Sequence, residues 1–289
     1  MGNLRLFVAC VAIWGTTWLA IKYQLGRVAP EASVSYRFVL ASFLIACYCR
    51  LRKLPLRFPA REHLWIALFG VLLFGVSYVF VYHAERHVVS GLVAVGYSAS
   101  PLLGALGMRL FFGVKISRRV ALGSLMGIAG IVLVFWPEFS RLRGDGDTAV
   151  GAMFTVAAVV LSALGTLTAH RNNEARLPLW QTMAWGMFYG ALFSLGATLA
   201  SGDALTFEAT PGYVLSLLYL SILGSVAAFA AYLTLVRNVG AARAGYTGVM
   251  VPIVALVVSA AFEGFHWTML TWAGIAVSVS GNVIILRRK

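Results

Sequence analysis

The stretch Gly123-Ser-Leu-Met-Gly-Ile-Ala-Gly130 returns 151 residues later as Gly274-Ile-Ala-Val-Ser-Val-Ser-Gly281. Pro101 and Gly113, which precede the first copy, also have a proline and a glycine at the same offset. The intervening residues are almost all apolar in both copies, and small residues at this spacing let helix backbones approach closely in lipid. The recurring stretch therefore predicts a duplicated bundle of membrane helices.

Composition supports a membrane protein. The chain of 289 residues has 60% hydrophobic residues, 11% charged residues and a mean hydropathy of +0.85. A helix needs about 20 apolar residues to cross a bilayer core. Ten such segments follow one another, at 4–22, 31–49, 64–83, 88–110, 119–137, 150–170, 178–200, 211–236, 241–262 and 268–286. We predict an all-α integral membrane protein with ten transmembrane helices.

The ten segments divide into two halves. Residues 1–137 contain the first five, residues 150–289 contain the other five, and residues 138–149 form a polar linker that we expect on the extracytoplasmic side. Because five is an odd number, the two halves must lie in the membrane in opposite orientations. The sequence therefore predicts two inverted five-helix repeats, which are typical of transporters that work by alternating access.

The basic residues are distributed unevenly across the predicted membrane. Of the 23 Lys and Arg residues, 17 fall in segments on the side of the N-terminus and five on the other side. Short cytoplasmic loops carry such an excess. We therefore expect a multi-pass protein of a bacterial-type cytoplasmic (inner) membrane with both termini in the cytoplasm. The net charge of +13 then reports topology and implies no nucleic-acid partner.

Several other function classes find no support in the sequence. The three cysteines, Cys10, Cys47 and Cys49, lie within predicted spans without metal-ligand spacing, so we expect no metal site and no cofactor. A membrane-embedded enzyme would need paired acids or a His/acid cluster inside the bundle. His170 and Glu174 are one turn apart but lie at a loop, so we expect no enzyme activity. No obligate protein partner is evident.

Three motifs carry a family resemblance. They are Trp14-Gly-Thr-Thr-Trp18, the run from Ser90 to Pro101, and Phe112-Gly-Val-Lys-Ile-Ser117. With them the chain resembles, over essentially its whole length, the drug/metabolite transporter superfamily of the EamA type, and within it most closely YddG-like amino-acid exporters. The resemblance implies export of aromatic and other neutral amino acids and related small metabolites. A multidrug or other metabolite exporter of the same fold is the alternative.

The chain departs from the family pattern at one position. The glutamate usual in the Gly-Glu-Lys-Ile-Ser motif is replaced by Val114 in the first half and by Phe265 in the second. Glu263 stands two positions before Phe265. The role of the family's glutamate therefore cannot be transferred to this chain.

Aromatic and hydroxyl side chains recur on one face of the 4–22 segment. Trp14 and Trp18 are four residues apart and flank a glycine, so they share a helical face. Packing or lipid contact is the competing interpretation for both tryptophans. We predict cavity-lining roles for Trp14, Thr17, Trp18 and the repeat-related Thr166, and hinge roles for Gly15 and Gly165.

The tyrosines form a second group. Tyr78 and Tyr82 are four apart, and Tyr232 is the repeat counterpart of Tyr82. A proline within a span frees a backbone carbonyl, which lipid tolerates only against protein or a wet cavity. Interfacial belts and simple packing kinks are the alternatives. We predict substrate-binding roles for Tyr78, Tyr82, Tyr97, Ser100, Tyr232 and Tyr246, and hinge roles for Pro101 and Pro252.

Few charged residues lie within the predicted spans. Arg37 is the one basic residue well inside a span, where an unpaired charge costs about 3 kcal/mol. Gating or contact with a carboxylate would explain it, as would snorkelling or a structural ion pair. Every Asp and Glu lies at or near the end of a span. This argues against a proton-coupled cation pump and favours transport of near-neutral solutes without strict proton coupling.

Overall fold

The computed structural model describes residues 2–141, 146–239 and 244–286, and every regular element in these ranges is helical. The first half contains α1 (Asn3–Lys22), α2 (Pro30–Leu51), a third span made of α3 (Ala60–Gly70), η1 (Val71–Val76) and α4 (Ser77–His87), a fourth made of α5 (Ser90–Gly96), η2 (Tyr97–Ala99) and α6 (Ser100–Phe112), and α7 (Arg118–Arg141). The second half contains α8 (Asp147–Glu174), α9 (Leu179–Ala200), an eighth span made of α10 (Pro211–Leu218), η3 (Tyr219–Ala227) and α11 (Ala228–Val239), α13 (Tyr246–Phe262) and α14 (Met269–Leu286).

These elements form ten apolar spans, as predicted. Eight are long and apolar enough to cross a bilayer, and the shorter α13 and α14 supply the ninth and tenth. The third and sixth spans begin and end several residues beyond their expected limits. Both helices that flank the expected linker extend into it, since α7 continues to Arg141 and α8 begins at Asp147. Residues 142–145 of the linker and residues 241–243 of the expected ninth span lie outside the described ranges.

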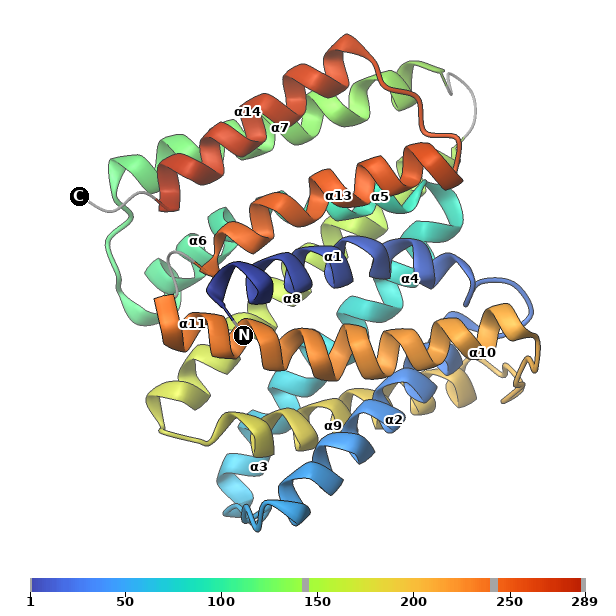
Figure 1. Ribbon diagram of the computed structural model, residues 1–289, viewed down its shortest axis with the longest axis vertical. Coiled ribbons are helices and arrows are strands. Elements are labelled where there is room, and N and C mark those ends of the chain that lie inside the picture. Colours follow the sequence, from blue (N-terminus) through green and yellow to red (C-terminus); the bar gives the residue numbers. More distant parts are fainter. Residues whose placement is uncertain (1, 142–145, 240–243, 287–289) are drawn as a thin grey trace.

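The glycine-rich stretches that define the repeat pack directly against each other. Figure 1 shows α7 and α14 side by side at one edge of the bundle. A Cβ on Gly123 would lie 2.3 Å from the carbonyl oxygen of Gly281, and a Cβ on Gly281 would lie 2.3 Å from that of Gly123. Gly130 and Gly274 form a second reciprocal contact. Because the pairing runs in opposite directions along the two helices, the equivalent fifth and tenth spans are antiparallel, which is the geometry that inverted repeats require.

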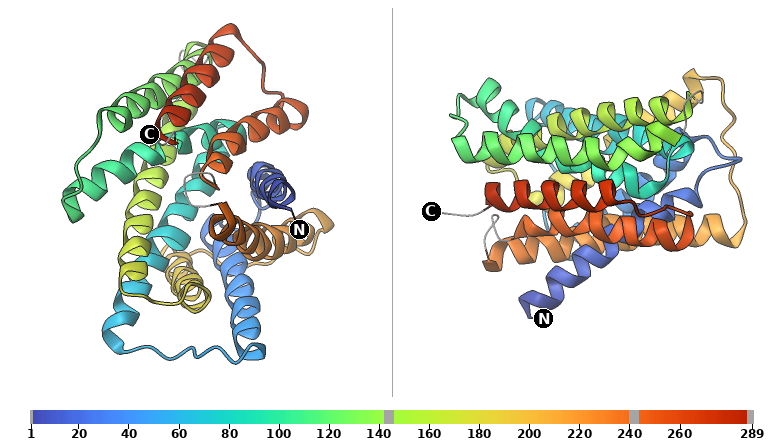
Figure 2. Two further views of the ribbon diagram at one scale, coloured as in Figure 1. Left: turned by 60° about the vertical axis from the view of Figure 1, so that its left-hand side comes forward. Right: turned by 90° about the horizontal axis from the view of Figure 1, so that it is seen from above.

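The second and seventh spans repeat this relationship. The hydroxyl of Ser35 in α2 donates to the carbonyl oxygen of Ala191 in α9 at 3.0 Å, and that of Ser42 donates to Ala184 at 2.8 Å. The residue numbers again run in opposite directions. The first helix of each half also packs against the third helix of the other half. In this way α1 packs on α11 and η3 of the eighth span, and α8 packs on α4 and η1 of the third span (Figure 2).

Local irregularities of the backbone are duplicated as well. The π-helical turns η1 and η3 occupy corresponding places in the third and eighth spans, since residues 71–76 plus 150 give 221–226. Gly113 and Gly264, a repeat pair, both adopt left-handed backbone conformations, with φ of 68° and 70°. Such a helix end strongly favours glycine. The duplicated glycines therefore mark duplicated chain turns.

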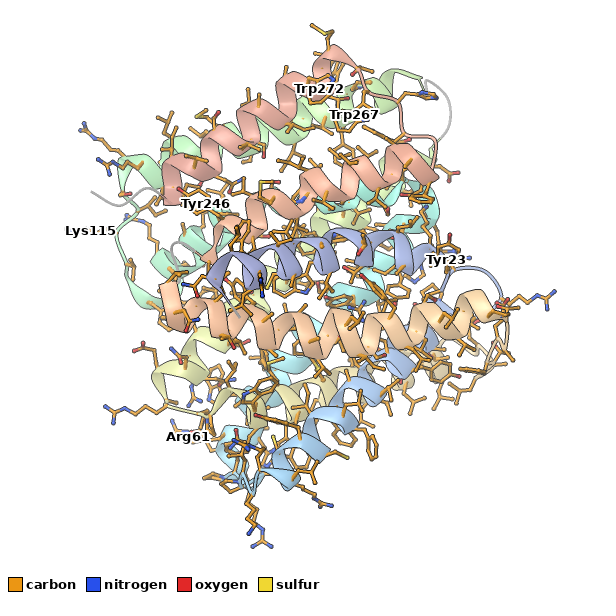
Figure 3. The ribbon with its side chains drawn as sticks, in the orientation of Figure 1. Tyr23, Arg61, Lys115, Tyr246, Trp267 and Trp272 are labelled. Atoms are coloured by element: carbon orange, nitrogen blue, oxygen red, sulfur yellow. The ribbon has the colours of Figure 1, made fainter. Side chains whose placement is uncertain are left out.

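The bundle has two ends, which we call the proximal and distal faces. The proximal face is the one at which α1 begins and α14 ends, and it carries Arg61, at the start of α3, and Lys115, in the loop after α6 (Figure 3). The distal face carries the ends of α1, α4 and α13, near Tyr23 and Trp267. The basic loops that follow α2 and α6 therefore share one face of the bundle, as the charge pattern predicted.

Candidate functional site

A cavity of about 430 Å³ lies between the two halves. Seven spans contribute to its wall, which is built mainly from aromatic, hydroxyl and aliphatic side chains. Among the described residues that line it, none carries a charge. The sequence-predicted residues that it brings together are Trp14, Thr17, Trp18, Tyr78, Tyr97, Ser100, Pro101, Thr166, Tyr232 and Pro252.

Two of the predicted tyrosines lie away from the cavity wall. Tyr82 is fully buried and does not line the cavity, although the residue before it, Val81, does. Tyr246 begins α13 at the proximal face, where its neighbours Gly245 and Thr247 line the cavity instead. Tyr246 itself is half-buried and does not line the cavity.

The predicted hinge glycines lie at helix contacts. A Cβ on Gly15 would lie 2.5 Å from Val254 of α13, and a Cβ on Gly165 would lie 2.8 Å from Leu73 of η1. Both glycines therefore permit close packing and do not reach the cavity. Of the two predicted proline breaks, Pro101 follows the 3₁₀ turn η2, whereas Pro252 lies inside the uninterrupted helix α13.

Sequence reasoning missed part of the wall. Phe74 lies in the π-helical turn η1, and Phe229 follows η3. Neither belongs to a polar or aromatic motif that distinguishes it from the many other apolar residues of its span. Asn282 is a polar residue inside the tenth span, and that signal could have identified it.

Trp14 joins the first span to the irregular eighth span. Its indole Nε1 donates to the carbonyl oxygen of Gly224, inside η3, at 3.1 Å. Its ring lies 5.3 Å from the rings of Phe229 and Tyr232. A π-helical turn changes the regular hydrogen-bond spacing of the helix, and such turns are frequent at functional sites. The contact fixes the tryptophan as one wall of the cavity.

A second aromatic contact closes the cavity toward the distal side. Trp18 lies 5.2 Å from the ring of Tyr97 in η2. The hydroxyl of Tyr97 lies 3.2 Å from that of Ser77, which donates to the carbonyl oxygen of Ala158 in α8. The 3₁₀ turn of the fourth span is therefore tied to the first, third and sixth spans.

Arg37 lies behind the cavity wall. It is only 2% exposed, and its guanidinium carbon is 4.6 Å from the ring centre of Tyr78, a lining residue. Its Nε donates to the hydroxyl of Ser225 at 3.3 Å, while Nη1 has no hydrogen-bond partner among the described residues. Tyr78 thus separates a buried positive charge from the cavity.

Charged and hydroxyl groups join three spans at the distal face. Lys22 Nζ lies 3.6 Å from a carboxylate oxygen of Glu263, at the end of α13. Glu263 also accepts hydrogen bonds from the backbone N–H and hydroxyl of Ser90, where α5 begins, and from the hydroxyl of Ser259 at 2.5 Å. We call Lys22, Ser90, Ser259 and Glu263 the distal lock.

The two ends of the cavity differ. Toward the proximal face the lining reaches Gly245, near the start of α13, and Ile285, near the end of α14. Toward the distal face it stops at Trp18 and Val81, and the distal lock lies beyond them. The structure therefore holds the cavity closed on the distal side. In the described part of the chain, no three His, Cys, Asp or Glu residues cluster as metal ligands.

Comparison with protein families gives a match in each half. The model of the EamA-like transporter family covers residues 2–136 and again residues 149–287. The two matches coincide with the five-helix halves that the packing defines.

Individual relatives cover nearly the whole chain. An uncharacterized inner membrane transporter of Escherichia coli K12, YedA, is 30% identical over 98% of this chain and 90% of its own length. An uncharacterized transporter of Archaeoglobus fulgidus is 23% identical over 96% of both chains. A solved protein crystal structure superposes with a TM-score of 0.71 over 98% of this chain and 96% of its own, at 17% identity, and so shares the fold.

Proposed function

Because this chain belongs to the EamA-like transporter family, within the drug/metabolite transporter superfamily, and is a membrane transporter, we propose that it exports neutral amino acids, aromatic ones among them, and related small metabolites. The observation that carries the proposal is the uncharged aromatic and hydroxyl-rich lining of the 430 Å³ cavity. Cavities of this size accept small organic molecules.

The lining groups suit a small amphipathic solute. The rings of Trp14, Trp18 and Tyr78 offer stacking surfaces, and they can also attract an ammonium group through cation–π contact. The hydroxyl of Ser100 can donate to a carboxylate, whereas that of Thr17 already donates to the carbonyl oxygen of Trp14 at 2.7 Å. A phosphorylated substrate would favour several Lys or Arg side chains at the cavity, and the described lining residues include none.

The same proposal includes alternating access. The inverted packing of the halves offers two related arrangements, and the distal lock stabilises the one with a closed distal face. The E. coli relative YedA is named an inner membrane transporter. By analogy, and from the basic residues of the proximal face, we place this chain in the cytoplasmic membrane with its proximal face in the cytoplasm.

Transport by the purified protein in liposomes tests the proposal. Counterflow of a labelled neutral amino acid should be accelerated by unlabelled aromatic and aliphatic amino acids on the opposite side of the membrane. Acidic, basic and phosphorylated solutes serve as controls of charge selectivity. If only cationic drugs or phosphorylated metabolites exchange, the amino-acid assignment is wrong and the chain is another exporter of the same fold.

A further inference from the structure

The distal face contains a buried carboxyl group that its neighbours do not satisfy. Glu85, in the last turn of α4, is 0% exposed, and neither of its carboxylate oxygens has a hydrogen-bond partner among the described residues. Glu263 offers the contrast, since it accepts hydrogen bonds from two serines and pairs with Lys22. Two acids at the same end of the bundle therefore have opposite surroundings.

Lys22 could satisfy Glu85 but is engaged elsewhere. Its ammonium group donates to the backbone carbonyl oxygens of Glu85 at 2.5 Å and Val88 at 3.0 Å, and it pairs with Glu263 at 3.6 Å. An ammonium group has three donors, and these contacts use them. The distal lock thus takes the cation and leaves the side chain of Glu85 without one.

The other groups that face Glu85 do not donate to it either. Arg37 of α2 and Tyr82 of α4 act on it electrostatically, but neither the guanidinium of Arg37 nor the hydroxyl of Tyr82 donates to its carboxylate oxygens. Tyr97 of η2 also interacts with it electrostatically.

The remaining ionisable groups of α4 and its neighbours point elsewhere. His83 pairs with Glu31 of α2, and His87 pairs with Asp147 of α8, at 2.7 and 3.0 Å. Arg86 is exposed on the distal face, near Glu31.

We propose that Glu85 is a proton-binding site and that its carboxyl group is protonated when the distal face is closed and ionised when it is open. An ionised carboxylate is costly to bury without a donor, so closure favours the neutral acid. When the distal lock separates, water reaches Glu85, and the proton passes to that water. Acidity at the distal face then favours closure. This inference rests on the alternating access proposed above.

Spin labels at the distal ends of α1 and α13 provide the test. Tyr23 and Phe262 are exposed there, so both can be replaced by cysteine and labelled after Cys10, Cys47 and Cys49 are replaced by serine. The distance between the labels distinguishes the closed from the open distal face. One linked proton changes the ratio of the two populations by at most about tenfold per pH unit. We expect a longer-distance population to grow as the pH rises from about 5 to 9.

Three variants separate this proposal from a general effect of pH. Glu85→Gln cannot ionise and should keep the short distance at every pH, while Glu85→Asp should retain a pH response. Asp203→Asn removes an exposed acid near the same face and should respond as the parent protein does. A thermal melt of each variant verifies folding. A parent protein without a pH response, or a Glu85→Gln variant that keeps it, overturns the proposal.

The readout does not depend on the substrate. If the distances respond to pH through Glu85 but no amino acid is transported, the proton site stands and the proposed substrate is wrong. If amino acids are transported while the distances ignore pH, the proton site alone is wrong.

Discussion

The two five-helix halves share a backbone but differ in most of their charged side chains at the distal and proximal faces. The glycine contacts between α7 and α14, the π-helical turns and the left-handed glycines all occur twice. The charges of the distal face occur once. With offsets of 150 or 151 residues, Lys22, Glu85 and Glu263 correspond to Asn172, Leu235 and Phe112 of the proximal side.

The cavity shows the same contrast. Trp14 corresponds to Leu164 and Tyr78 corresponds to Ala228, so the first half supplies the larger aromatic groups. A symmetric backbone allows the bundle to close at either face with equivalent helix contacts. Under the alternating access proposed above, the unmatched side chains would decide which closed state is preferred and where the substrate is held.

The largest effect should come from disrupting the glycine contact between α7 and α14, to which both halves contribute equivalent residues. A Cβ on Gly274 would lie 2.6 Å from the carbonyl oxygen of Gly130, and backbone atoms cannot move away easily. We expect Gly274→Ala to lower the free energy of unfolding by about 3 kcal/mol, which thermal denaturation in detergent would detect. Gly123→Ala, the equivalent change in the first half, should be similarly harmful.

Gly104→Ala is the matched control for that experiment. A Cβ at this position would have nothing within 4 Å, so the same chemical change should be neutral or stabilising. Equal losses in Gly104→Ala and Gly274→Ala would show that the close helix contact is not the cause.

The next largest effect should come from disrupting the distal lock, which has no counterpart at the repeat-related positions of the proximal face. Glu263→Gln removes the charge that Lys22 and two serines recognise, and hydrogen bonds to a charged group are worth about 2 kcal/mol. The ratio of closed to open distal faces should fall by about thirtyfold. A cysteine at Ala94, on the cavity wall, should then react faster with a thiol reagent added from the distal side.

Glu208→Gln provides the control for the lock. Glu208 accepts a hydrogen bond from Thr210 at the same face but lies in the exposed 203–210 loop. If both variants change the reactivity of the probe equally, a general loss of negative charge explains the result, and the distal lock is not a gate.

A smaller effect on transport should distinguish Trp14 from Leu164, the residue at the repeat-related position. Trp14→Ala loses ring contacts and the hydrogen bond to Gly224, and a stacking contact is worth about 1 kcal/mol. We expect amino-acid transport to fall about tenfold while the melting temperature stays close to that of the parent protein. Leu164→Ala, at the repeat-related position, should have little effect on transport. Equal losses in the two variants would indicate that packing, not recognition, is responsible.

The smallest effect concerns the hydroxyl group of Tyr78. Tyr78→Phe keeps the ring that covers Arg37 and lines the cavity. We expect transport within about threefold of the parent protein, since a hydrogen bond of a neutral hydroxyl contributes about 1 kcal/mol or less. Tyr78→Ala should instead fall about tenfold. A larger loss in Tyr78→Phe than in Tyr78→Ala would contradict the importance of the ring.

The global fold could be predicted because its signals are repeated along the chain. Each span is long and apolar, and each half ends on the same spacing of proline and glycines. The face shared by Trp14 and Trp18 also follows from helical periodicity, and both residues line the cavity. Their roles in substrate recognition remain predictions.

The details that make the site irregular could not be predicted. The π-helical turns η1 and η3 consist of the same apolar residues as the helices around them, so their sequences do not distinguish the two hydrogen-bond patterns. The surroundings of Glu85 were missed for another reason. An acid near the end of a span is usually solvated, and its burial depends on the ends of α1 and α13, which are far away in the sequence.

The contact between α7 and α14 has a consequence for how such a chain can evolve. Gly123 faces Gly281, the copy of Gly130, and Gly130 faces Gly274, the copy of Gly123, which is the arrangement of an isologous interface in a symmetric dimer. In a dimer of identical subunits every substitution appears at both ends of the molecule. Joined in one polypeptide, the two copies of a position mutate separately. Lys22 and Glu263 can therefore bind at one face of the membrane while Asn172 and Phe112 remain neutral at the other.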